Sequence, residues 1–347
     1  MKILIVKLSS IGDVVHTLPA LSAIKNALPK AEISWAVEKG AAEILRGNPL
    51  LSRIIEVDTK NLRRRETIGQ TLAAARGQLK EIRAGVFDVT LDFQGLLKSA
   101  LIAKISRAKS RCGFSRKFLR EPASRFLLTE TIDVEPKSHV VVKNLTLAAK
   151  ALKIPVSTEN FEFPIFTDEI HRQEAIEIIS RANRRFALLN PAGGWATKLW
   201  NAEKFGKLAD RLWEEAGLVS IVTTAPQEKE KILAERVLNS AKSGKIILAN
   251  PSLKGFYELA KRADVYIGGD TGPTHLAVAA GAPTVGIFGP TEWWFNGSPN
   301  PKDICVERTD IACRTNCNRR ICNNWICLDI EVETVLKAVR KRLGQDN

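Results

Sequence analysis

Short runs of β-branched and other apolar residues alternate with amphipathic stretches along the whole 347-residue chain. This alternation is typical of parallel sheets, in which a helical crossover joins each strand to the next. In the first half we expect strands at Lys2–Lys7, Ile33–Val37, Ile54–Val57 and Asp88–Phe93, and helices near 14–28, 66–83 and 139–152. In the second half we expect strands at Phe186–Asn190, Val219–Thr223, Ile246–Leu248, Val265–Gly268 and Thr284–Phe288, and helices near 202–215, 227–239, 255–262 and 274–280. The predicted fold class is therefore α/β, with two similar doubly wound domains.

The segment from Ile154 to Asp168 separates the two halves. It contains Pro155 and Pro164 and has no helical period, which is typical of a linker. A chain of 347 residues is also long enough for two domains of roughly 150 residues each. We expect an N-terminal domain over 1–160, a second domain over 161–330 and a C-terminal helix over 331–347.

The net charge and the lack of long apolar runs limit the expected partners and location of the protein. Lys and Arg number 52 against 38 Asp and Glu, and this net charge of +14 favours a polyanionic partner such as nucleic acid, an anionic membrane or a phosphorylated substrate. No stretch approaches the ~18 consecutive apolar residues of a membrane span, since Lys143 interrupts one of the longest candidates. The apolar run from Ile3 to Val6 is too short for a signal peptide. We therefore expect a cytoplasmic protein that does not cross a bilayer.

The loop Lys7–Asp13 follows the first expected strand. Doubly wound sheets bind ligands beyond the carboxyl ends of their strands, so this loop is a candidate site. It turns at Gly12 and brings Asp13 to a helix start, where the carboxylate is either a helix N-cap or a general base. The loop lacks the G-x-G-x-x-G pattern and the chain lacks G-x-x-x-x-G-K-[ST], so dinucleotide binding has little support and P-loop enzymes are excluded.

Three loops of the second half carry further candidates. Gly268–His275 opens a helix with Pro273 suited to its first turn, and it forms either an anion site or only a tight turn. Lys198, which follows the sequence NPAGG at 190–194, is either a diphosphate ligand or a solvated lysine. Glu228 begins a helix, where it either accepts hydrogen bonds from ribose hydroxyls or complements the helix dipole.

Basic residues are concentrated in the first half. Nine of them lie between positions 98 and 125, against Glu121 alone. Arg63, Arg64 and Arg65 form a run that is either a solvated face or a site for phosphate and carboxylate groups. The first domain is therefore expected to be positive.

Four of the six cysteines are close in sequence, at Cys313, Cys317, Cys322 and Cys327. Three, four and four residues separate them, unlike the paired C-x₂-C of common zinc modules. A disulfide framework is not expected in a reducing compartment. The interpretations are a structural metal site, an iron–sulfur cluster, or reduced structural cysteines.

Four ordered motifs resemble one family. They are KLSSIGDVVHTLPAL at 7–21, DFQGLLKS at 92–99, NPAGG at 190–194 followed by KLW at 198–200, and DTGPTH at 270–275. Together they resemble the ADP-heptose:lipopolysaccharide heptosyltransferases of glycosyltransferase family nine over nearly the whole chain, and the first motif is most similar to the heptosyltransferase I branch. The resemblance implies a GT-B fold, in which two Rossmann-like domains with parallel sheets face across a cleft. The N-terminal domain would bind the acceptor and the C-terminal domain the nucleotide-sugar.

The same resemblance implies roles for single residues. Asp13 corresponds to the proposed catalytic base of the family. The positions that correspond to donor-binding residues, for the diphosphate, the ribose and the sugar region, are Lys198, Glu228, Asp270, Thr271, Gly272 and His275. The positions implied for the anionic acceptor are Gln94, Lys98, Arg120, Arg63 and Arg64, with Arg65 in the same basic loop. The cysteine-rich tail departs from the enterobacterial form of the branch.

The implied reaction is an inverting, metal-independent transfer of heptose from ADP-L-glycero-D-manno-heptose to the Kdo or inner core of lipopolysaccharide. The chain has no Asp-x-Asp motif, so no cofactor is expected to be required, and the cysteines remain a candidate for a structural metal. Expected partners are ADP-heptose, Kdo-lipid A or inner-core lipopolysaccharide, and the anionic inner face of the inner membrane, on which the protein would be peripheral.

Three alternative functions remain. The first is another family-nine transferase, either a second or third core heptosyltransferase or an enzyme for a different sugar. The second is a nucleotide-sugar epimerase of the same fold. The third is a nucleic-acid-binding protein. The last has the positive charge in its favour, but no known nucleic-acid-binding motif is present, so we expect no nucleic-acid partner.

Overall fold

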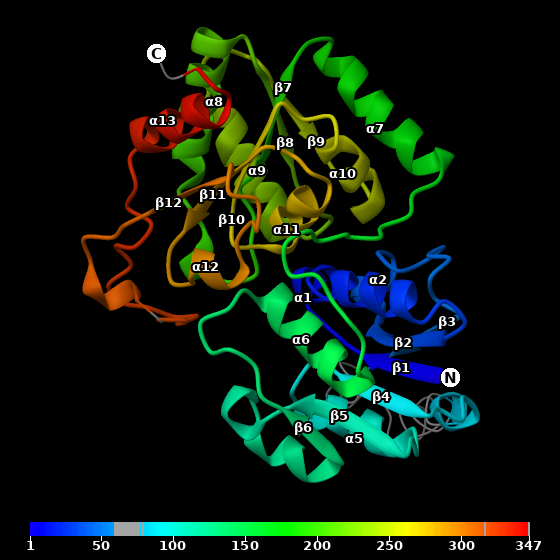
Figure 1. Cartoon of the computed structure of the whole chain (residues 1–347). Coiled ribbons are helices and arrows are strands. Elements are labelled where there is room, and N and C mark those ends of the chain that lie inside the picture. Colours follow the sequence, from blue (N-terminus) through cyan, green and yellow to red (C-terminus); the bar gives the residue numbers. More distant parts are fainter. Residues whose placement is uncertain (59–76, 78–79, 316, 346–347) are drawn as a thin grey trace. The chain divides into compact units, whose positions relative to one another are not determined.

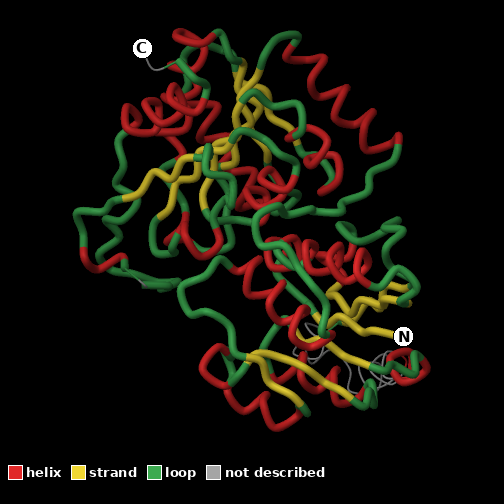
Figure 2. The backbone as a smooth tube through the Cα atoms, viewed as in Figure 1, coloured by secondary structure: helices red, strands yellow, loops and turns green. Residues whose placement is uncertain are grey.

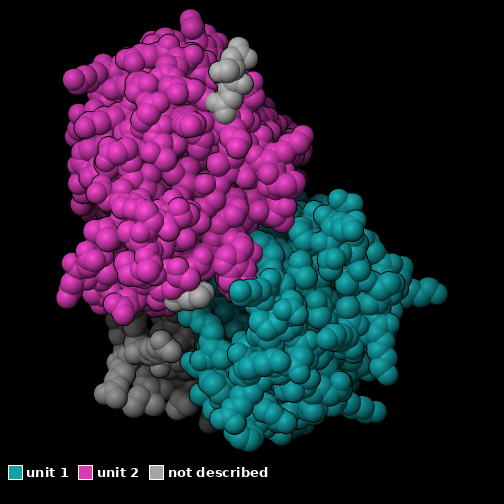
Figure 3. All heavy atoms as spheres, turned by 60° about the vertical axis from the view of Figure 1, so that its left-hand side comes forward, with its two compact units in different colours: residues 1–166 teal, residues 167–347 magenta. Residues whose placement is uncertain are grey.

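The computed structural model describes residues 1–58, 77, 80–315 and 317–345. The chain divides into two compact units, Met1–Phe166 and Thr167–Asn347, which Figure 3 shows in different colours. The division lies a few residues beyond the predicted boundary at 160, near the end of a segment, 153–168, that contains no helix or strand. The arrangement of the two units across a cleft and their separate ligands stay predictions.

The first unit contains one parallel sheet of six strands in the described part of the chain, with the order β3-β2-β1-β4-β5-β6. The strands are β1 (Lys2–Val6), β2 (Glu32–Glu38), β3 (Arg53–Val57), β4 (Val89–Asp92), β5 (Ser110–Phe114) and β6 (Glu130–Ile132). This is the strand order of a Rossmann domain, in which the chain runs outward from the first strand and then returns to start again beside it.

Helices cover both faces of this sheet (Figure 1). They are α1 (Ile11–Val15), α2 (Leu18–Ala27), α3 (Lys39–Ala42), α5 (Leu97–Ile105) and α6 (Val140–Leu152), with 3-10 turns η2 (Arg116–Phe118) and η3 (Pro122–Leu127). Leu4 and Val6 pack with Ile102 of α5 in one buried cluster, because alternate residues of a strand point to the same face. Helices α2 and α6 pack against each other on the other face.

The second unit repeats the plan, with a parallel sheet of six described strands in the order β12-β11-β10-β7-β8-β9. The strands are β7 (Phe186–Asn190), β8 (Val219–Thr223), β9 (Ile246–Ala249), β10 (Val265–Gly269), β11 (Thr284–Phe288) and β12 (Ile304–Glu307). Numbered within the unit, this is the same Rossmann order, and Figure 2 shows one strand-rich sheet with flanking helices in each unit.

The helices of the second unit also form two layers. They are α7 (Glu169–Ala182), α8 (Ala202–Ala216), α9 (Glu228–Ser240), α10 (Leu253–Ala260), α11 (Gly272–Ala279), α12 (Trp293–Asn296) and α13 (Val332–Arg342), with 3-10 turns η4 (Ala196–Lys198) and η5 (Ala312–Arg314). Phe205 of α8, Val237 of α9 and Val335 of α13 bury themselves in one core. The predicted C-terminal helix is thus α13, a packed part of the second unit. Among the described residues, no helix is long and apolar enough to span a bilayer.

The predicted α/β class is confirmed, and most predicted strands match the structure to within a residue or two. The sequence did not reveal β5, β6, β12, α5 or α7, nor the short helices α3 and α12. Strand β5, for example, carries Arg111 and Gly113 in place of a β-branched run. The helix expected at 14–28 is divided into α1 and α2, and Pro19 lies in the first turn of α2, where its missing N–H is tolerated. The helix expected at 66–83 lies largely outside the described residues.

Candidate active site

The strand order reverses between β1 and β4 in the first unit and between β7 and β10 in the second. Val6 is paired with Asp92 in the first sheet, and Asn190 with Gly268 in the second. The loops that leave these paired strand ends therefore begin side by side. Ligands of doubly wound folds bind at such reversals, so each unit has one candidate site that follows from its topology alone.

The loop after β1 is held in place by the loop after β4. Lys7 Nζ donates to the Phe93 carbonyl at 2.8 Å, and the buried Gln94 accepts the N–H groups of Leu8 and Ser9 at Oε1, at 3.0 and 3.2 Å. These contacts join segments more than 80 residues apart. Gln94, predicted to bind the acceptor, thus also fixes the loop that carries Asp13.

Asp13 lies in the first turn of α1. Ser10 occupies the N-cap position, so the interpretation of Asp13 as an N-cap is wrong: Asp13 is the third helical residue and binds back to the cap. Its Oδ2 accepts from the N–H and Oγ of Ser10 at 2.8 and 3.0 Å, and its Oδ1 is 3.6 Å from Lys7 Nζ. The Asp13 side chain is 36% exposed. It is therefore an oriented carboxylate that solvent or a substrate hydroxyl can reach.

A second carboxylate, Asp92, lies buried at the end of β4. It accepts the N–H groups of Gln94 and Gly95 and the hydroxyl of Ser99, at 2.9, 3.2 and 3.0 Å. Burial raises the pKa of Asp92 to about 6, although these hydrogen bonds and the charge of Lys7 oppose the shift. From the sequence, Asp92 was part of the motif at 92–99 but was not predicted as a site residue by itself. Its burial at the end of β4 cannot be seen in the sequence.

Of the other residues predicted to bind the acceptor, Lys98 and Arg120 lie in the described part of the chain. Lys98, in the first turn of α5, pairs with Glu38 at 2.6 Å. Arg120 lies beside Gly95, which has a left-handed φ of +70°: a Cβ added at Gly95 would lie 4.0 Å from the backbone N of Arg120. The structure thus brings Lys98 and Arg120 to the loop that follows β4. The other predicted acceptor residues, Arg63, Arg64 and Arg65, lie outside the described residues.

In the second unit Asp270 is the centre of a charged cluster. It is almost fully buried and follows β10 directly. Its carboxylate pairs with Lys198 Nζ, lies 3.2 Å from His275 Nε2 and accepts from Asn296 Nδ2 at 2.9 Å. Burial raises the pKa of Asp270, but His275 and Lys198 outweigh it and hold this pKa well below its usual range. Asp270 is therefore a fixed anion that aims Lys198.

The two loops at this reversal touch each other closely. A Cβ added at Gly269 would lie 2.8 Å from the Lys198 carbonyl, and one added at Gly193 would lie 2.9 Å from Thr271 Cγ2. Helix α11 begins here, with Thr271 as N-cap and Gly272 as first residue. Backbone N–H groups at a helix start, with an adjacent lysine, favour a bound anion such as a diphosphate. Pro273 lies in the first turn, as predicted.

Two residues that were not predicted, Glu230 and Asn296, support the loops of the predicted donor site. Glu228 is the first residue of α9 and is exposed, whereas Glu230 accepts the N–H of Ala225 at 3.0 Å, so Glu230 supports the loop after β8. Asn296, which the sequence analysis did not single out, contacts Asp270 from α12. Its Oδ1 is buried and makes no hydrogen bond within the described part of the chain. No sequence signal pointed to Asn296.

Three of the four late cysteines lie within electrostatic range of the fourth, Cys327. Burial raises the pKa of Cys327, and Cys317, Cys322 and Cys313 raise it further. Cys327 also packs on the end of β11, since a Cβ at Gly289 would lie 3.1 Å from its Sγ. Over the described ranges, which omit residue 316, no three or more His, Cys, Asp or Glu side chains are arranged to hold a metal ion. The structural metal site therefore stays a prediction.

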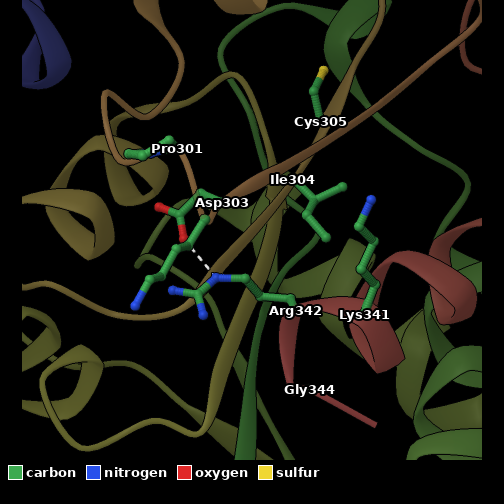
Figure 4. Close-up of a pocket in the computed structure, with 8 residues that line it drawn as sticks. Pro301, Asp303, Ile304, Cys305, Lys341, Arg342 and Gly344 are labelled. Carbon is green, nitrogen blue, oxygen red and sulfur yellow. Dashed lines mark hydrogen bonds and ion pairs between the residues drawn. The ribbon is translucent and has the colours of Figure 1, made fainter. Parts of the chain in front are cut away.

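A surface pocket of about 480 Å³ lies elsewhere in the second unit (Figure 4). It is lined by residues 301–305 at the start of β12 and by the end of α13, where Arg342 pairs with Asp303 at 2.8 Å. Because β12 runs parallel to its neighbours, this is the amino end of the sheet, opposite the edge that carries Lys198 and Asp270. The pocket contains none of the predicted site residues.

Comparison with known proteins agrees with the motifs. Residues 76–324 match the model of "Glycosyltransferase family 9 (heptosyltransferase)". A curated relative, lipopolysaccharide heptosyltransferase 1 of Pseudomonas aeruginosa, is 30% identical over 93% of this chain and 87% of its own length.

Solved structures share the fold. The glycosyltransferase of family 9 from Veillonella parvula superposes with a TM-score of 0.81 at 22% identity, covering 99% of this chain and 97% of that one. Escherichia coli heptosyltransferase WaaC with ADP-2-deoxy-2-fluoro heptose gives a TM-score of 0.77 at 23% identity, covering 97% and 99%. The resemblance read from the four motifs is confirmed: the chain belongs to glycosyltransferase family 9, the heptosyltransferases, and is a glycosyltransferase.

Proposed function

We propose that this glycosyltransferase moves heptose from ADP-heptose to the Kdo or inner core of lipopolysaccharide, as heptosyltransferase I enzymes do. The observation that carries the proposal is the pair of switch-point sites in a family-9 chain. One holds the half-exposed carboxylate of Asp13, and the other holds Lys198 beside the start of α11. A carboxylate that reaches a hydroxyl and a cation that holds a diphosphate are the two groups that glycosyl transfer from a nucleotide-sugar needs.

The proposed chemistry is a single inverting displacement. Asp13 takes the proton of an acceptor hydroxyl while that oxygen attacks the anomeric carbon of the heptose. The bond from this carbon to the diphosphate oxygen breaks, and ADP leaves with the electron pair. Lys198 and the N–H groups at Thr271 and Gly272 stabilise the negative charge that grows on the diphosphate. The step balances without a metal ion.

The proposed substrates follow the two units. The second unit would hold ADP-heptose, with Lys198 fixed by Asp270, which His275 also contacts, and with Glu228 at the adenosine ribose. The first unit would hold the acceptor, whose Kdo carboxylates and phosphates suit Lys98 and Arg120. Because this acceptor is a membrane lipid, we also propose a peripheral location on the cytoplasmic face of the inner membrane.

The test is an acceptor assay with the purified protein. We expect incubation with ADP-heptose and Kdo-lipid A to release ADP and to raise the acceptor mass by one heptose. Transfer only to an acceptor that already carries heptose would assign a later step of core synthesis. A changed sugar nucleotide released without any acceptor would contradict the proposal and indicate an epimerase.

A further inference from the structure

Three large apolar side chains are exposed on two neighbouring segments of the first unit. Leu97 and Leu101 of α5 are 44% and 51% exposed, and Phe126 of η3 is 82% exposed. The two segments pack on each other, with Ala100 and Ala103 of α5 buried against Leu128 at the end of η3. Single exposed apolar side chains are ordinary on a protein surface, whereas several on segments that pack on each other indicate an interaction surface.

The two segments are tied together at their starts. The N–H of Leu97 donates to the Glu121 carboxylate at 2.7 Å, and the N–H of Glu121 lies 3.4 Å from the Gly95 carbonyl. Leu97 and Leu101 are four residues apart in a helix, so they lie on one side of it. Leu97, Leu101 and Phe126, with the segments that carry them, are called the α5–η3 surface below.

The α5–η3 surface carries basic residues. Helix α5 contains Lys98 and Lys104, and η3 contains Arg125. Between positions 98 and 125 the chain has nine basic residues, although some of them, such as Arg111 on β5, bind within the unit. Glu121 is the one acid in this stretch, and its carboxylate accepts the hydrogen bond from Leu97. Exposed apolar side chains among many cations complement a surface that is anionic outside and apolar within.

We propose that the α5–η3 surface docks on an anionic lipid bilayer, with Phe126, Leu101 and Leu97 inserted among the lipids and the cations on the headgroups. This rests on the proposed membrane-bound acceptor, for which it names the docking surface. Interfacial binding of this kind combines apolar burial with attraction to anionic lipids.

The position of the surface fits delivery of a lipid-linked acceptor. Leu97 precedes Lys98, and the N–H of Leu97 is bound by Glu121, which follows Arg120, so Leu97 lies near two of the predicted acceptor-binding residues. Both lie next to the loop after β4 that fixes the Asp13 segment. An acceptor headgroup in the same membrane would therefore meet these cations first. Aliphatic Leu97 and Leu101 suit lipid acyl chains better than the phosphates and stacked bases of a nucleic acid.

The experiment is flotation of the full chain with vesicles of phosphatidylglycerol and phosphatidylethanolamine, compared with phosphatidylcholine vesicles. We expect Leu101→Ser with Phe126→Ser to lower the partition coefficient at least tenfold, since burial of one such side chain alone is worth about that much. The matched control is Ile170→Ser on α7, because Ile170 is 77% exposed in the second unit and its loss should leave binding unchanged. Phe126→Leu, which stays apolar, should retain most of the binding and shows that the Ser variants fail through polarity and not through misfolding.

The cations give a second arm. Lys104→Gln with Arg125→Gln should weaken binding to anionic vesicles by about fivefold per charge removed, and salt should reduce the difference. Binding to phosphatidylcholine vesicles should not change. Equal flotation of the wild type and the Ser double variant would overturn the proposal. So would a change of oligomeric state in the double variant without vesicles, which would indicate a protein partner, or a loss of oligonucleotide binding in place of vesicle binding.

Heptose transfer to a detergent-dispersed acceptor is measured in parallel. If flotation depends on Phe126 and Leu101 but no ADP is released, the docking surface stands and the proposed function fails. If heptose is transferred but substitution of Leu101 and Phe126 leaves flotation unchanged, the docking proposal is contradicted and the proposed function is not.

Discussion

Two buried aspartates lie at the carboxyl ends of corresponding strands in the two sheets, and their pKa values shift in opposite directions. Asp92 ends β4 and Asp270 follows β10, and each of these is the fourth strand of its unit. Burial raises the pKa of Asp92 to about 6. The pKa of Asp270 is instead held well below its usual range by His275 and Lys198, despite a similar burial. Topology therefore sets where the carboxylate lies, and the neighbouring groups set its charge.

The two aspartates also differ in what they hold in place. Asp92 accepts two backbone N–H groups and a hydroxyl, so it shapes the loop that carries Gln94. Asp270 pairs with Lys198, which it holds at the start of α11. In the first unit the chemically available carboxylate is Asp13, on the neighbouring loop and 36% exposed. The first unit therefore has an exposed carboxylate on the loop after β1 and a buried one at the end of β4.

The largest expected effect tests Asp13 as the available carboxylate. Asp13→Asn keeps the shape but cannot take a proton, so we expect kcat for heptose transfer to fall about 10²–10⁴-fold. Calorimetry should find ADP affinity unchanged, because the proposed donor residues lie in the other unit. Near-normal turnover in a folded variant would remove Asp13 from the chemistry.

The opposite pKa shifts of Asp92 and Asp270 predict opposite pH dependences of the free energy of unfolding. The pKa of Asp92 is raised from 3.8 to about 6, so ionising it in the folded protein costs about 3 kcal/mol. Its raised pKa makes wild-type stability fall, relative to Asp92→Asn, as pH rises from about 4 through 6. Urea unfolding of both proteins across this range measures the difference.

The lowered pKa of Asp270 predicts the opposite sign. Its stabilising contribution is complete above the unfolded pKa of 3.8 and is lost as pH falls below that value. The stability advantage of the wild type over Asp270→Asn should therefore be constant from pH 7 to 5 and shrink in more acidic urea titrations. The same sign for both aspartates would break the comparison.

A smaller effect is expected at the lysine that Asp270 holds. Lys198→Ala removes a charge-assisted contact, and we expect ADP affinity measured by calorimetry to fall roughly 10–100-fold. The matched control is Lys204→Ala. Lys204 is also an ion-paired lysine of the second unit, with Asp329 and Glu331, so its loss should leave ADP affinity unchanged. Equal losses in the two variants would exclude a specific role for Lys198.

The smallest effect concerns the close approach of the donor loops. A methyl group at Gly269 would lie 2.8 Å from the Lys198 carbonyl, so Gly269→Ala should cost about 1–3 kcal/mol of stability. Gly194→Ala is the control, because nothing lies within 4 Å of a Cβ there. Urea unfolding that finds both variants equally stable would mean that the loops shift apart without cost.

Local pattern was sufficient for much of the fold. The strands at Phe186–Asn190, Val219–Thr223 and Thr284–Phe288 match their predicted bounds, because buried parallel strands are nearly continuous apolar runs. Strands β5 and β6 were not predicted. The first contains an arginine and a glycine, which interrupt an apolar run, and the second has only three residues. The pairing of β5 with β4 and of β6 with β5 decides that they are strands, and pairing is not a local property.

Only some residues of the candidate site could be predicted from the sequence. Asp13, Lys198 and Asp270 lie in recognisable motifs at strand ends, so the sequence alone selected them. Lys7 and Asn296 were missed, since each matters through a partner that the fold brings near: Phe93 for Lys7 and Asp270 for Asn296. The second of these partners is 26 residues away and the first 86, distances that no local pattern spans.

The amino-acid order by itself determined the class of fold and the family, because strand and helix periods and the four motifs are written along the chain. Only the tertiary structure decided which carboxylates are charged and which are reachable. A pKa depends on burial and on the charges within a few ångströms, and those neighbours come from strands and loops far apart in the sequence.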